Sequence, residues 1–174
     1  MKPVLVSTPA GTLAVGATAT AVVMCDYTHS PHFSAHCNDC ATLECDKSMT
    51  DTAVARLLEY FAGTRTAFNI PVAPTGTPFR QKVWAALAEI PYGSTVSYTD
   101  IAAAIGQPRA VRAVAQAIAS NPINIILPCH RVVGKNGQLT GYAGGITAKE
   151  LLLRLEKEHS DSRLYASADI CDLM

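Results

Sequence analysis

The chain lacks any long apolar run. Its 174 residues are 49% hydrophobic and 16% charged, but Met1-Lys2-Pro3 is followed only by Val4-Leu5-Val6 before polar residues return. A signal peptide needs about 7–15 consecutive apolar residues and a membrane-spanning helix about 20. We therefore expect neither, and we expect a cytoplasmic protein without a membrane partner. The high apolar content also argues against a disordered chain, because it is enough to build a core.

The chain also lacks net charge. Its 14 basic and 14 acidic side chains cancel, which argues against a generally basic nucleic-acid-binding protein. The average hides a division along the chain. Residues 74–160 contain nine Lys and Arg against five Asp and Glu, a balance of +4, whereas residues 1–73 and 161–174 each have a balance of −2. A polyanion would therefore bind residues 74–160.

Disulfides are not expected either. Without an export signal, the six cysteines are predicted to be reduced thiols, metal ligands or a catalytic group, with reduced thiols as the default. One segment of little apolar periodicity, residues 25–45, contains four cysteines and three histidines. Sulfur and imidazole ligands suit zinc, but one Cys-x-x-Cys without a second pair is a weak signal. An irregular surface loop is the interpretation we favour over a zinc site formed by Cys25, His29, Cys37 and Cys40.

The first 73 residues are predicted to form a small antiparallel sheet with one helix. Short runs rich in β-branched residues, separated by Pro, Gly and Thr, are typical of strands joined by tight turns, and they cover residues 4–6, 11–15 and 21–25. Apolar side chains at helical intervals predict a helix over residues 51–62. Residues 67–72 are a candidate for one more strand, and residues 73–76 have the composition of a linker.

The next part of the chain is predicted to be mostly helical. A capping threonine followed by proline opens a core helix over residues 77–90. Ser97 begins a weak capping box for a short helix, and Pro108 is predicted to open another one with a regular apolar face. Joined by Gly106-Gln107, these two helices have the outline of a helix-turn-helix.

These elements predict an α+β fold with a small N-terminal antiparallel sheet and helix, followed by a mostly helical domain with a helix-turn-helix. We expect an N-terminal domain over residues 1–73, a second domain over residues 74–160 and a C-terminal tail over residues 161–174.

The second helix of the helix-turn-helix has features of a nucleic-acid contact. Arg109 and Arg112 are three residues apart on its predicted outward face, with Ala113, Gln116 and Ala117 beside them. Small residues let a backbone approach a groove closely, and arginine contacts phosphate or acts as a planar probe. An ordinary solvated helix face with two arginines explains the same pattern, so the motif needs further support.

The most specific chemical signal is Pro128-Cys129-His130-Arg131-Val132 at the end of an apolar segment. A neighbouring base raises the thiolate fraction of a cysteine, whereas apolar burial without a partner lowers it. His130 could supply that base. Because a cysteine in an apolar run is more often an inert core residue, the sequence pattern leaves both catalysis and packing open.

His130 would need further help to act as the base. Adjacent side chains tend to point apart, so if Cys129 closes a strand, His130 reaches the sulfur only through a bend or a bridging water. A carboxylate would be needed to hold the imidazole in one tautomer. Glu156, beside the apolar face of a helix expected over residues 147–159, is the best candidate. The alternative is a surface glutamate paired with lysines of its own helix.

A turn over residues 134–137 and a glycine-rich loop over residues 140–145 follow the cysteine. Such a loop lets a planar ligand approach backbone amides, and Tyr142 offers a stacking face. It is not a phosphate-binding loop, because no Gly-Lys-Ser/Thr follows.

Several short segments occur together in this order: Gly76-Thr77-Pro78-Phe79, Pro91-Tyr92-Gly93, Ser97-Tyr98, Arg112-Ala113-Val114, Asn121-Pro122, Pro128-Cys129-His130-Arg131-Val132 and Gly141-Tyr142-Ala143-Gly144-Gly145. Taken together they resemble the O6-alkylguanine-DNA alkyltransferases, or methylated-DNA–protein-cysteine methyltransferases. The resemblance covers about residues 76–158. The preceding residues resemble the N-terminal domain of that family only in length and strand-rich character.

The resemblance implies the following catalytic roles. Cys129 is the acceptor thiolate, His130 deprotonates it through a water, and Glu156 orients His130. Asn121 lies at the hinge between the helix-turn-helix and the nucleophile, where its amide bonds to both backbones. Tyr98 turns the phosphate of the target nucleotide and donates a hydrogen bond to the departing guanine.

The resemblance also implies binding of double-stranded DNA that contains O6-alkylguanine. The second helix would lie in the minor groove, and Arg112 would fill the gap left by the flipped nucleotide. The expected DNA contacts are Tyr98, Thr99, Arg109, Arg112, Ala113, Gln116 and Ser120. The expected alkylguanine pocket consists of Ile118, Asn124, Val132, Leu139, Tyr142 and Ala143. Asn124 and Ala143 stand where relatives often have proline and serine, which leaves the accepted alkyl size open.

The implied function is DNA repair by direct, irreversible transfer of an alkyl group, such as methyl, from O6-alkylguanine to Cys129, with O4-alkylthymine as a further candidate substrate. Because a thioether offers water no carbonyl to attack, each molecule would act once. We expect a monomer that needs no cofactor and no small-molecule methyl donor. Two alternatives remain: a lesion-binding protein without transfer, against which Cys129 counts, and a cysteine hydrolase, for which the helix-turn-helix would be superfluous.

Overall fold

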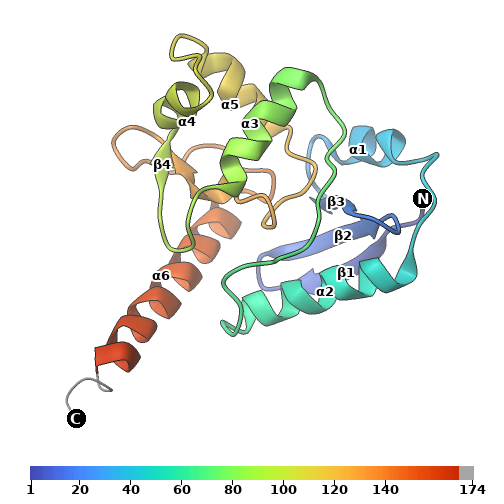
Figure 1. Ribbon diagram of the computed structural model, residues 1–174, viewed down its shortest axis with the longest axis horizontal. Coiled ribbons are helices and arrows are strands. Elements are labelled where there is room, and N and C mark those ends of the chain that lie inside the picture. The colour runs from blue at the N-terminus through green and yellow to red at the C-terminus, as the bar shows by residue number, and fades with distance from the viewer. Residues whose placement is uncertain (169–174) are drawn as a thin grey trace.

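The computed structural model describes residues 1–168, with side chains up to residue 160. Its first element is a three-stranded antiparallel sheet in the order β1 (Val4–Thr8), β2 (Gly11–Ala17) and β3 (Val22–Tyr27). The three predicted strands are therefore confirmed, each extended by two residues at its C-terminal end. Figure 1 shows the sheet beside the helical part of the molecule.

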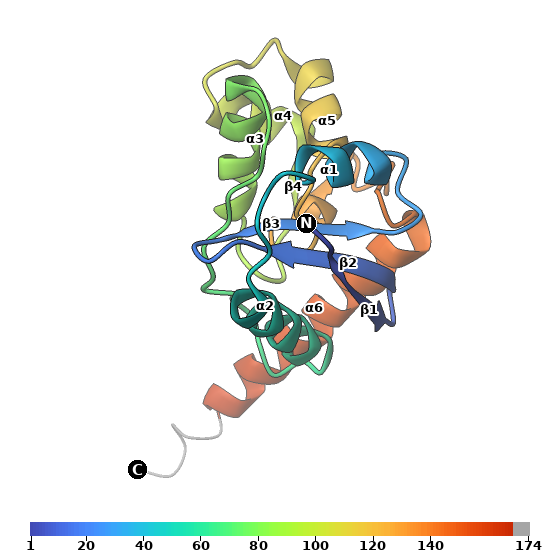
Figure 2. The ribbon, with the colours of Figure 1, turned by 90° about the vertical axis from the view of Figure 1, so that its right-hand side faces the viewer.

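Two helices cover opposite faces of the sheet (Figures 1 and 2). Strand residues alternate between the faces, so Val15 belongs to the same core cluster as Leu57 of α2 (Lys47–Phe61), whereas Met24 belongs to a separate small cluster on the side of α1 (Phe33–Asp39). Helix α2 begins four residues earlier than predicted, because the Asp46 side chain accepts a hydrogen bond from a backbone N–H of its first turn.

The additional strand predicted over residues 67–72 is wrong. Only Val72 forms a bridge, to Val22 of β3. Asn69 has a φ of 47°, a left-handed conformation that interrupts an extended run, and Pro71 has no N–H to donate to a sheet.

The C-terminal part is mostly helical, as predicted. Helix α3 (Pro78–Ala88) lies in front of α4 (Tyr98–Ala104) and α5 (Val111–Ala119) in the view of Figure 1, and α4 and α5 form the helix-turn-helix. Trp84 of α3 joins them, because its indole N–H donates to the backbone oxygen of Ala117 at 2.7 Å. The predicted α+β fold class is confirmed. Within residues 1–168, no helix is both long and apolar enough to span a bilayer.

The boundaries of the helix-turn-helix follow from its caps. Ser97 and Asp100 form the predicted capping box, in which each side chain accepts the backbone N–H of the other. Helix α5 begins at Val111 and not at Pro108 as predicted. The N–H of Ala110 bonds to the oxygen of Gln107 at 2.9 Å, which places Pro108 in the second position of a turn that its fixed φ favours.

Backbone pairing along β3 joins the two halves of the chain. The N–H of Cys25 donates to Pro122 at 2.9 Å, and the N–H of Asn124 donates back to Cys25 at 2.7 Å. At the other end of β3, Val22 bonds in the same way to Pro71 and to Ala73, the first linker residue. The edge of the sheet is therefore capped by the segment that leads to Cys129.

The last helix, α6 (Ile146–Ala168), packs against the turn formed by Cys129–Arg131 and then extends away from the rest of the molecule (Figures 1 and 2). The short strands β4 (Val96–Ser97) and β5 (Val132–Val133) pair in parallel, which joins the start of α4 to the end of the segment that contains Cys129, called the nucleophile segment below. Residues 161–168 of the predicted tail continue the backbone of α6, and residues 169–174 lie outside the described part of the chain. The domain boundaries stay a prediction.

Candidate active site

Asn121 connects the end of α5 to the segment that carries the nucleophile. Its side-chain nitrogen donates to the backbone oxygens of Leu127 and Ile123 at 2.9 and 3.4 Å, and its side-chain oxygen accepts from the N–H of Ile123 at 3.0 Å. These bonds close the segment around Ile125, whose φ of 71° is rare for a β-branched residue. Local strain of this kind persists where surrounding bonds over-determine the conformation.

Cys129 begins a single 3-10 turn, η1 (Cys129–Arg131), in which the chain bends instead of continuing as a strand. The thiol is buried, 4% exposed, and donates to the side-chain oxygen of Asn124 at 3.3 Å. Burial raises the pKa of the Cys129 thiol to about 11, although the Asn121 side chain and the charge of Lys149 act in the opposite direction. A resting thiolate is therefore scarce at neutral pH, and any nucleophilic reaction of this thiol needs a base.

His130 is fully buried and has one ring nitrogen fixed by Glu156. The distance between Nε2 and the Glu156 carboxylate is 2.8 Å. Because a carboxylate only accepts, Nε2 carries the proton and Nδ1 presents a lone pair. Nδ1 is buried and has no hydrogen-bond partner among the described residues. Burial lowers the pKa of His130, with Glu156 opposing it, so the ring is neutral at pH 7. A neutral imidazole with a free lone pair can take a proton.

Glu156 is fully buried, which excludes the surface ion pair considered from the sequence. Besides His130, its oxygens accept hydrogen bonds from the Tyr60 hydroxyl at 2.7 Å, the backbone N–H of Gly93 at 3.0 Å and the Arg131 guanidinium at 2.9 and 3.0 Å. Burial raises the pKa of the Glu156 carboxyl, but the bonds and charges of His130 and Arg131 outweigh it and hold the pKa at about 2. The carboxylate is ionised throughout the physiological range.

Lys149 lies on the same face of α6, two turns before Glu156, and it is also fully buried. Its ammonium donates to the backbone oxygens of Val132 at 2.6 Å and Thr140 at 3.1 Å. Burial lowers the pKa of Lys149, and the neighbouring Cys129 raises it. The ammonium therefore ties the glycine-rich loop to β5 and favours a negative charge on the sulfur.

A cavity of about 540 Å³ lies beside this centre. Tyr98, Tyr142 and Ala143, all predicted at the site, line it together with Pro31 and His32 from the N-terminal half. The Tyr98 hydroxyl bonds to the Thr140 hydroxyl at 2.8 Å. The cavity is large enough for a purine with a small substituent.

The other predicted pocket residues lie outside the lining of this cavity. Ile118, Asn124 and Val132 are buried, and Leu139 is half-buried. Asn124 instead contacts the sulfur itself. Within the glycine-rich loop, Gly144 lies against the ring of Tyr27, and a Cβ at this position would come within 2.6 Å of that ring. The group that approaches the backbone closely at Gly144 is therefore the Tyr27 side chain.

The predicted DNA-contact residues divide into two groups. Arg112, Ala113 and Gln116 are exposed on α5, and Thr99 is exposed on α4. Arg109 is exposed but lies in the turn before α5, which corrects its assignment to the helix. Ser120 is buried and donates to Ala117 at 3.1 Å, and Ala117 is buried as well, so neither side chain is on the outward face.

Comparisons with known proteins decide the family. The family described as "6-O-methylguanine DNA methyltransferase, DNA binding domain" matches residues 78–158. The chain is 51% identical to a methylated-DNA–protein-cysteine methyltransferase of Methanosarcina barkeri over 114 residues, which is 66% of this chain and 72% of that protein.

The chain belongs to the methylated-DNA–protein-cysteine methyltransferase family.

Two further relatives agree with this membership. A constitutive methyltransferase of Bacillus subtilis is 58% identical over 106 residues, 60% of this chain and 64% of that protein. The crystal structure of Mycobacterium tuberculosis OGT in complex with DNA has a TM-score of 0.79 and 41% identity, and the match covers 89% of this chain and 92% of that one. The structural likeness therefore includes the N-terminal half, beyond the segment in which the methyltransferase motifs were recognised.

Sequence reasoning missed three partners in this methyltransferase site: Tyr60, Lys149 and Asp26. Tyr60 lies at a core position of α2, and a buried tyrosine hydroxyl needs a partner, which was the available signal. Asp26 is a fully buried acid in β3. No local pattern indicates that β3 packs against the nucleophile segment, so the role of Asp26 could not be read from its neighbours.

The zinc candidates are not brought together in this member of the family. Within residues 1–168, no group of three or more His, Cys, Asp or Glu is arranged to hold a metal ion. Cys25 is buried in β3, His29 lies beside Tyr27, and Cys37 and Cys40 belong to α1 and its C-terminal cap. The segment is also more regular than expected, because α1 forms within it.

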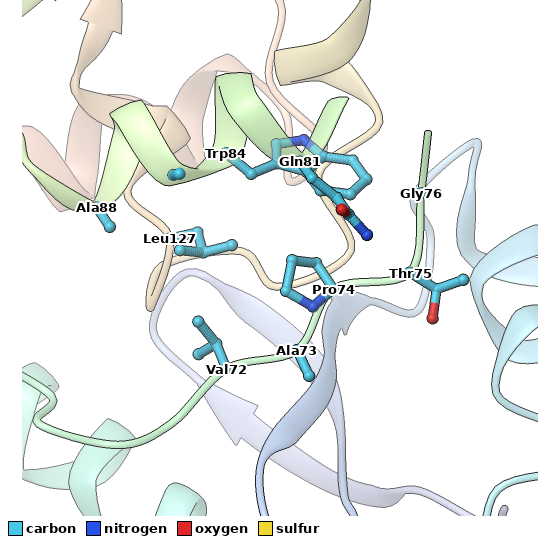
Figure 3. Close-up of a pocket in the computed structure, with 10 residues that line it drawn as sticks. Val72, Ala73, Pro74, Thr75, Gly76, Gln81, Trp84, Ala88 and Leu127 are labelled. Carbon is cyan, nitrogen blue, oxygen red and sulfur yellow. The ribbon is translucent and has the colours of Figure 1, made fainter. Parts of the chain in front are cut away.

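A second cavity, of about 500 Å³, lies away from the methyltransferase centre, between the linker and α3. Figure 3 shows Pro74 facing Gln81 and Trp84 of α3, with Leu127 beside them on the left of the view. No titratable side chain lines it. It therefore offers no group for acid–base or nucleophilic chemistry.

Proposed function

We propose that this protein repairs DNA by a single, irreversible transfer of an alkyl group from O6-alkylguanine in double-stranded DNA to the sulfur of Cys129. The observation that carries the proposal is the tautomer and hydrogen bonding of His130, the residue that follows this cysteine. Its Nε2 is fixed by Glu156, and its Nδ1 is buried with a free lone pair among the described residues. Family membership supports the same chemistry.

The thiol proton passes through a water to Nδ1 of His130, because the direct hydrogen bond of the sulfur goes to Asn124. Glu156 stabilises the imidazolium that forms. The charge of Lys149 stabilises the thiolate, since it opposes the effect of burial on the pKa of Cys129. Activation at the moment of transfer avoids maintaining a reactive anion in the resting protein.

The thiolate then displaces guanine from the alkyl carbon. The C–S bond forms as the bond between carbon and O6 breaks, and the electron pair leaves with the base, which takes a proton. Tyr98, at the cavity wall, is the proposed hydrogen-bond donor to the departing guanine. The thioether has no carbonyl for water to attack, so the thiol is not regenerated and no cofactor or small-molecule methyl donor takes part.

The target nucleotide must leave the duplex, because an alkyl carbon inside the base stack cannot meet a buried sulfur. Unstacking costs a few kcal/mol, and contacts in the cavity and an inserted side chain offset it. Arg112 is the proposed insert, since it is exposed on α5 beside the small side chain of Ala113. Asn121 couples α5 to the nucleophile segment, because its backbone N–H donates to Ile118 of α5 and its side chain bonds to Ile123 and Leu127.

The setting is proposed to be the cytoplasm, with the protein acting as a monomer. The five cysteines described, Cys25, Cys37, Cys40, Cys45 and Cys129, are all free thiols, which suits a reducing compartment.

The proposal is tested by incubating the protein with duplex DNA that contains one O6-methylguanine and then measuring the masses of the protein's peptides by mass spectrometry. We expect a gain of one methyl group confined to the peptide with Cys129, and no gain with an undamaged duplex. Cys129→Ser is the matched variant, because it keeps a hydroxyl donor for Asn124 but is a far weaker nucleophile, and it should gain nothing.

Three results would contradict the proposal. Methylation of another residue would show that Cys129 is not the acceptor. Tight binding of damaged DNA without mass gain would favour a lesion-binding protein. Repeated release of methanol with an unmodified protein would favour a hydrolase.

A further inference from the structure

A buried chain of hydrogen bonds runs from the N-terminal half of the molecule to the nucleophile. Nδ1 of His36 lies 2.7 Å from one carboxylate oxygen of Asp26, and the other oxygen accepts from the side-chain nitrogen of Asn124 at 2.8 Å. The side-chain oxygen of Asn124 accepts from the sulfur of Cys129 at 3.3 Å. All four side chains are buried, and Asp26 and Asn124 have no exposed surface.

The bonds leave only one orientation for the Asn124 amide. The Asp26 carboxylate can only accept, and the backbone oxygen of Asn121, 3.2 Å from the same Asn124 nitrogen, can only accept as well. The amide nitrogen must therefore face these two groups, and the amide oxygen must face Cys129. An acceptor beside the sulfur stabilises the S–H form and repels a thiolate.

We propose that Asp26 is a positioning residue that keeps Cys129 protonated in the free protein by holding the amide oxygen of Asn124 toward the sulfur. The proposal rests on the proposed function of Cys129 as the alkyl acceptor, and it adds control of that group by the N-terminal half. Neutralising Asp26 would let the Asn124 amide rotate and present its N–H₂ to the sulfur instead.

His36 makes the buried charge of Asp26 tolerable. A buried carboxylate is costly unless it is paired and hydrogen-bonded. Asp26 has three donors: His36 of α1, Asn124 and the backbone N–H of Tyr27 at 2.8 Å. The ring of His32, 5.9 Å from that of His36, lines the cavity proposed for the base. His32 and His36, at the start of α1 and within it, therefore connect this short helix to the cavity and to the chain of hydrogen bonds that leads to Cys129.

Other charged and titratable groups belong to the elements around this sulfur. They come from β3, from the glycine-rich loop, from η1 and from α6: Cys25, Asp26, Tyr27, Tyr142, His130 with its partner Glu156, and Lys149. Among them, the charge of Asp26 raises the pKa of Cys129 and the charge of Lys149 lowers it. Asp26 and Lys149 therefore act in opposite directions on the same proton.

The test measures how fast iodoacetamide alkylates Cys129 as a function of pH, without DNA. The thiolate displaces iodide and forms a thioether, and peptide masses give the rate at Cys129, with the exposed Cys45 as internal reference. For Asp26→Asn we expect the midpoint of the pH profile to move to lower pH and the rate at pH 7 to rise about tenfold, since one pKa unit changes a small thiolate fraction by that factor.

A second variant and a control keep the test decisive. Asn124→Ala removes the acceptor beside the sulfur and should move the midpoint in the same direction. Asp39→Asn removes an exposed carboxylate from the last residue of α1 and should leave the profile unchanged. A change in access to the buried thiol would alter the plateau rate at high pH without moving the midpoint, so a purely structural effect is separated from the proposed one.

A midpoint that stays in place, or rises, in both Asp26→Asn and Asn124→Ala would overturn the inference. The proposed function is tested separately by methyl transfer from DNA to the wild-type protein. If transfer occurs while the midpoints do not move, only the role of Asp26 fails. If the midpoints move but no methyl group is transferred, the proposed function fails and the control of the thiol stands.

Discussion

At the scale of single residues, Glu156 determines which atom of His130 can act as a base. Its oxygens bind His130, Arg131, Tyr60 and Gly93 with no contribution from solvent, because the side chain is fully buried. A buried ion pair is weak evidence for stability, but breaking it is costly since the remaining charge is left unpaired. The same bonds that hold the helix in place therefore set the tautomer of the His130 imidazole, the proposed base.

Replacing Glu156 with glutamine should impair both stability and transfer. The change leaves the buried Arg131 guanidinium without a counter-charge, so we expect the free energy of unfolding in urea to fall by about 3 kcal/mol. A glutamine can also present its N–H₂ to Nε2, which would favour the wrong tautomer and slow methyl transfer about 100-fold or more. Glu150→Gln, an exposed change on the same helix, should cost at most about 0.5 kcal/mol and leave transfer unchanged. Equal effects of the two substitutions would contradict this role.

The stability of the protein should decrease as the pH is lowered from neutral. The unfolded chain binds a proton on histidine from about pH 6.5, whereas burial lowers the pKa of His130 in the folded state. The pKa of Glu156 is about 2 in the folded state against an ordinary 4.5, so its contribution, about 3 kcal/mol, is complete above pH 4.5 and is lost as the pH falls toward 2. Urea unfolding at a series of pH values measures this. A flat profile between pH 7 and 3 would show that these two groups are not buried as described.

Some site residues could be predicted from the sequence and others could not. Cys129 and His130 lie in one motif, and Glu156 lies beside the apolar stripe of its helix, so local pattern and family resemblance were enough for all three. Asp26 and Tyr60 reach the site only through tertiary packing, and a buried polar residue on a strand or helix has no local mark of its partner.

At the scale of elements, the helix-turn-helix presents two arginines in different settings. Arg112 lies on α5, whereas Arg109 lies in the turn that precedes it. The predicted start of the helix at Pro108 was wrong because proline also suits a turn, and the Gln107 to Ala110 bond selects the turn. Helix propensity and capping patterns predicted the existence of these elements well, but element ends depend on such local competition.

The two arginines should therefore behave differently on DNA. Arg109→Ala should remove one phosphate contact, which weakens binding to damaged and undamaged duplex equally and lowers the salt dependence of binding by about one counterion. Arg112→Ala should weaken binding to damaged duplex more than binding to undamaged duplex. It should also slow methyl transfer, because no side chain then fills the space that the flipped nucleotide leaves in the base stack. Binding at several salt concentrations and single-turnover transfer distinguish the two. Identical behaviour of both variants would contradict the assignment of Arg112 as the insert.

At the scale of the whole molecule, β3 connects the halves that the sequence suggested as separate domains. Its edge pairs with the linker and with Pro122 and Asn124, and Tyr60 of α2 bonds to Glu156 of α6. The sheet and the helices were predictable one by one. Their contact was not, because pairing between segments about 100 residues apart leaves no periodic signal in either one.

The two halves should consequently unfold together. Trp84, the single tryptophan, lies in the C-terminal half, and its fluorescence should report the same urea midpoint as circular dichroism of the whole backbone. Two separated transitions would indicate that residues 1–73 and 74–160 are independent domains and that the contacts along β3 contribute little.

The central claim is that one sulfur accepts one alkyl group and is then consumed. The most direct measurement mixes the protein with an excess of duplex DNA that carries radiolabelled O6-methylguanine and counts the label on the protein over time. The account predicts that labelling stops at one methyl group per chain, that the label remains on Cys129, and that fresh DNA restores no activity. Labelled methyl released into solution beyond the amount of protein, or a chain that stays unlabelled while it binds the lesion, would contradict it.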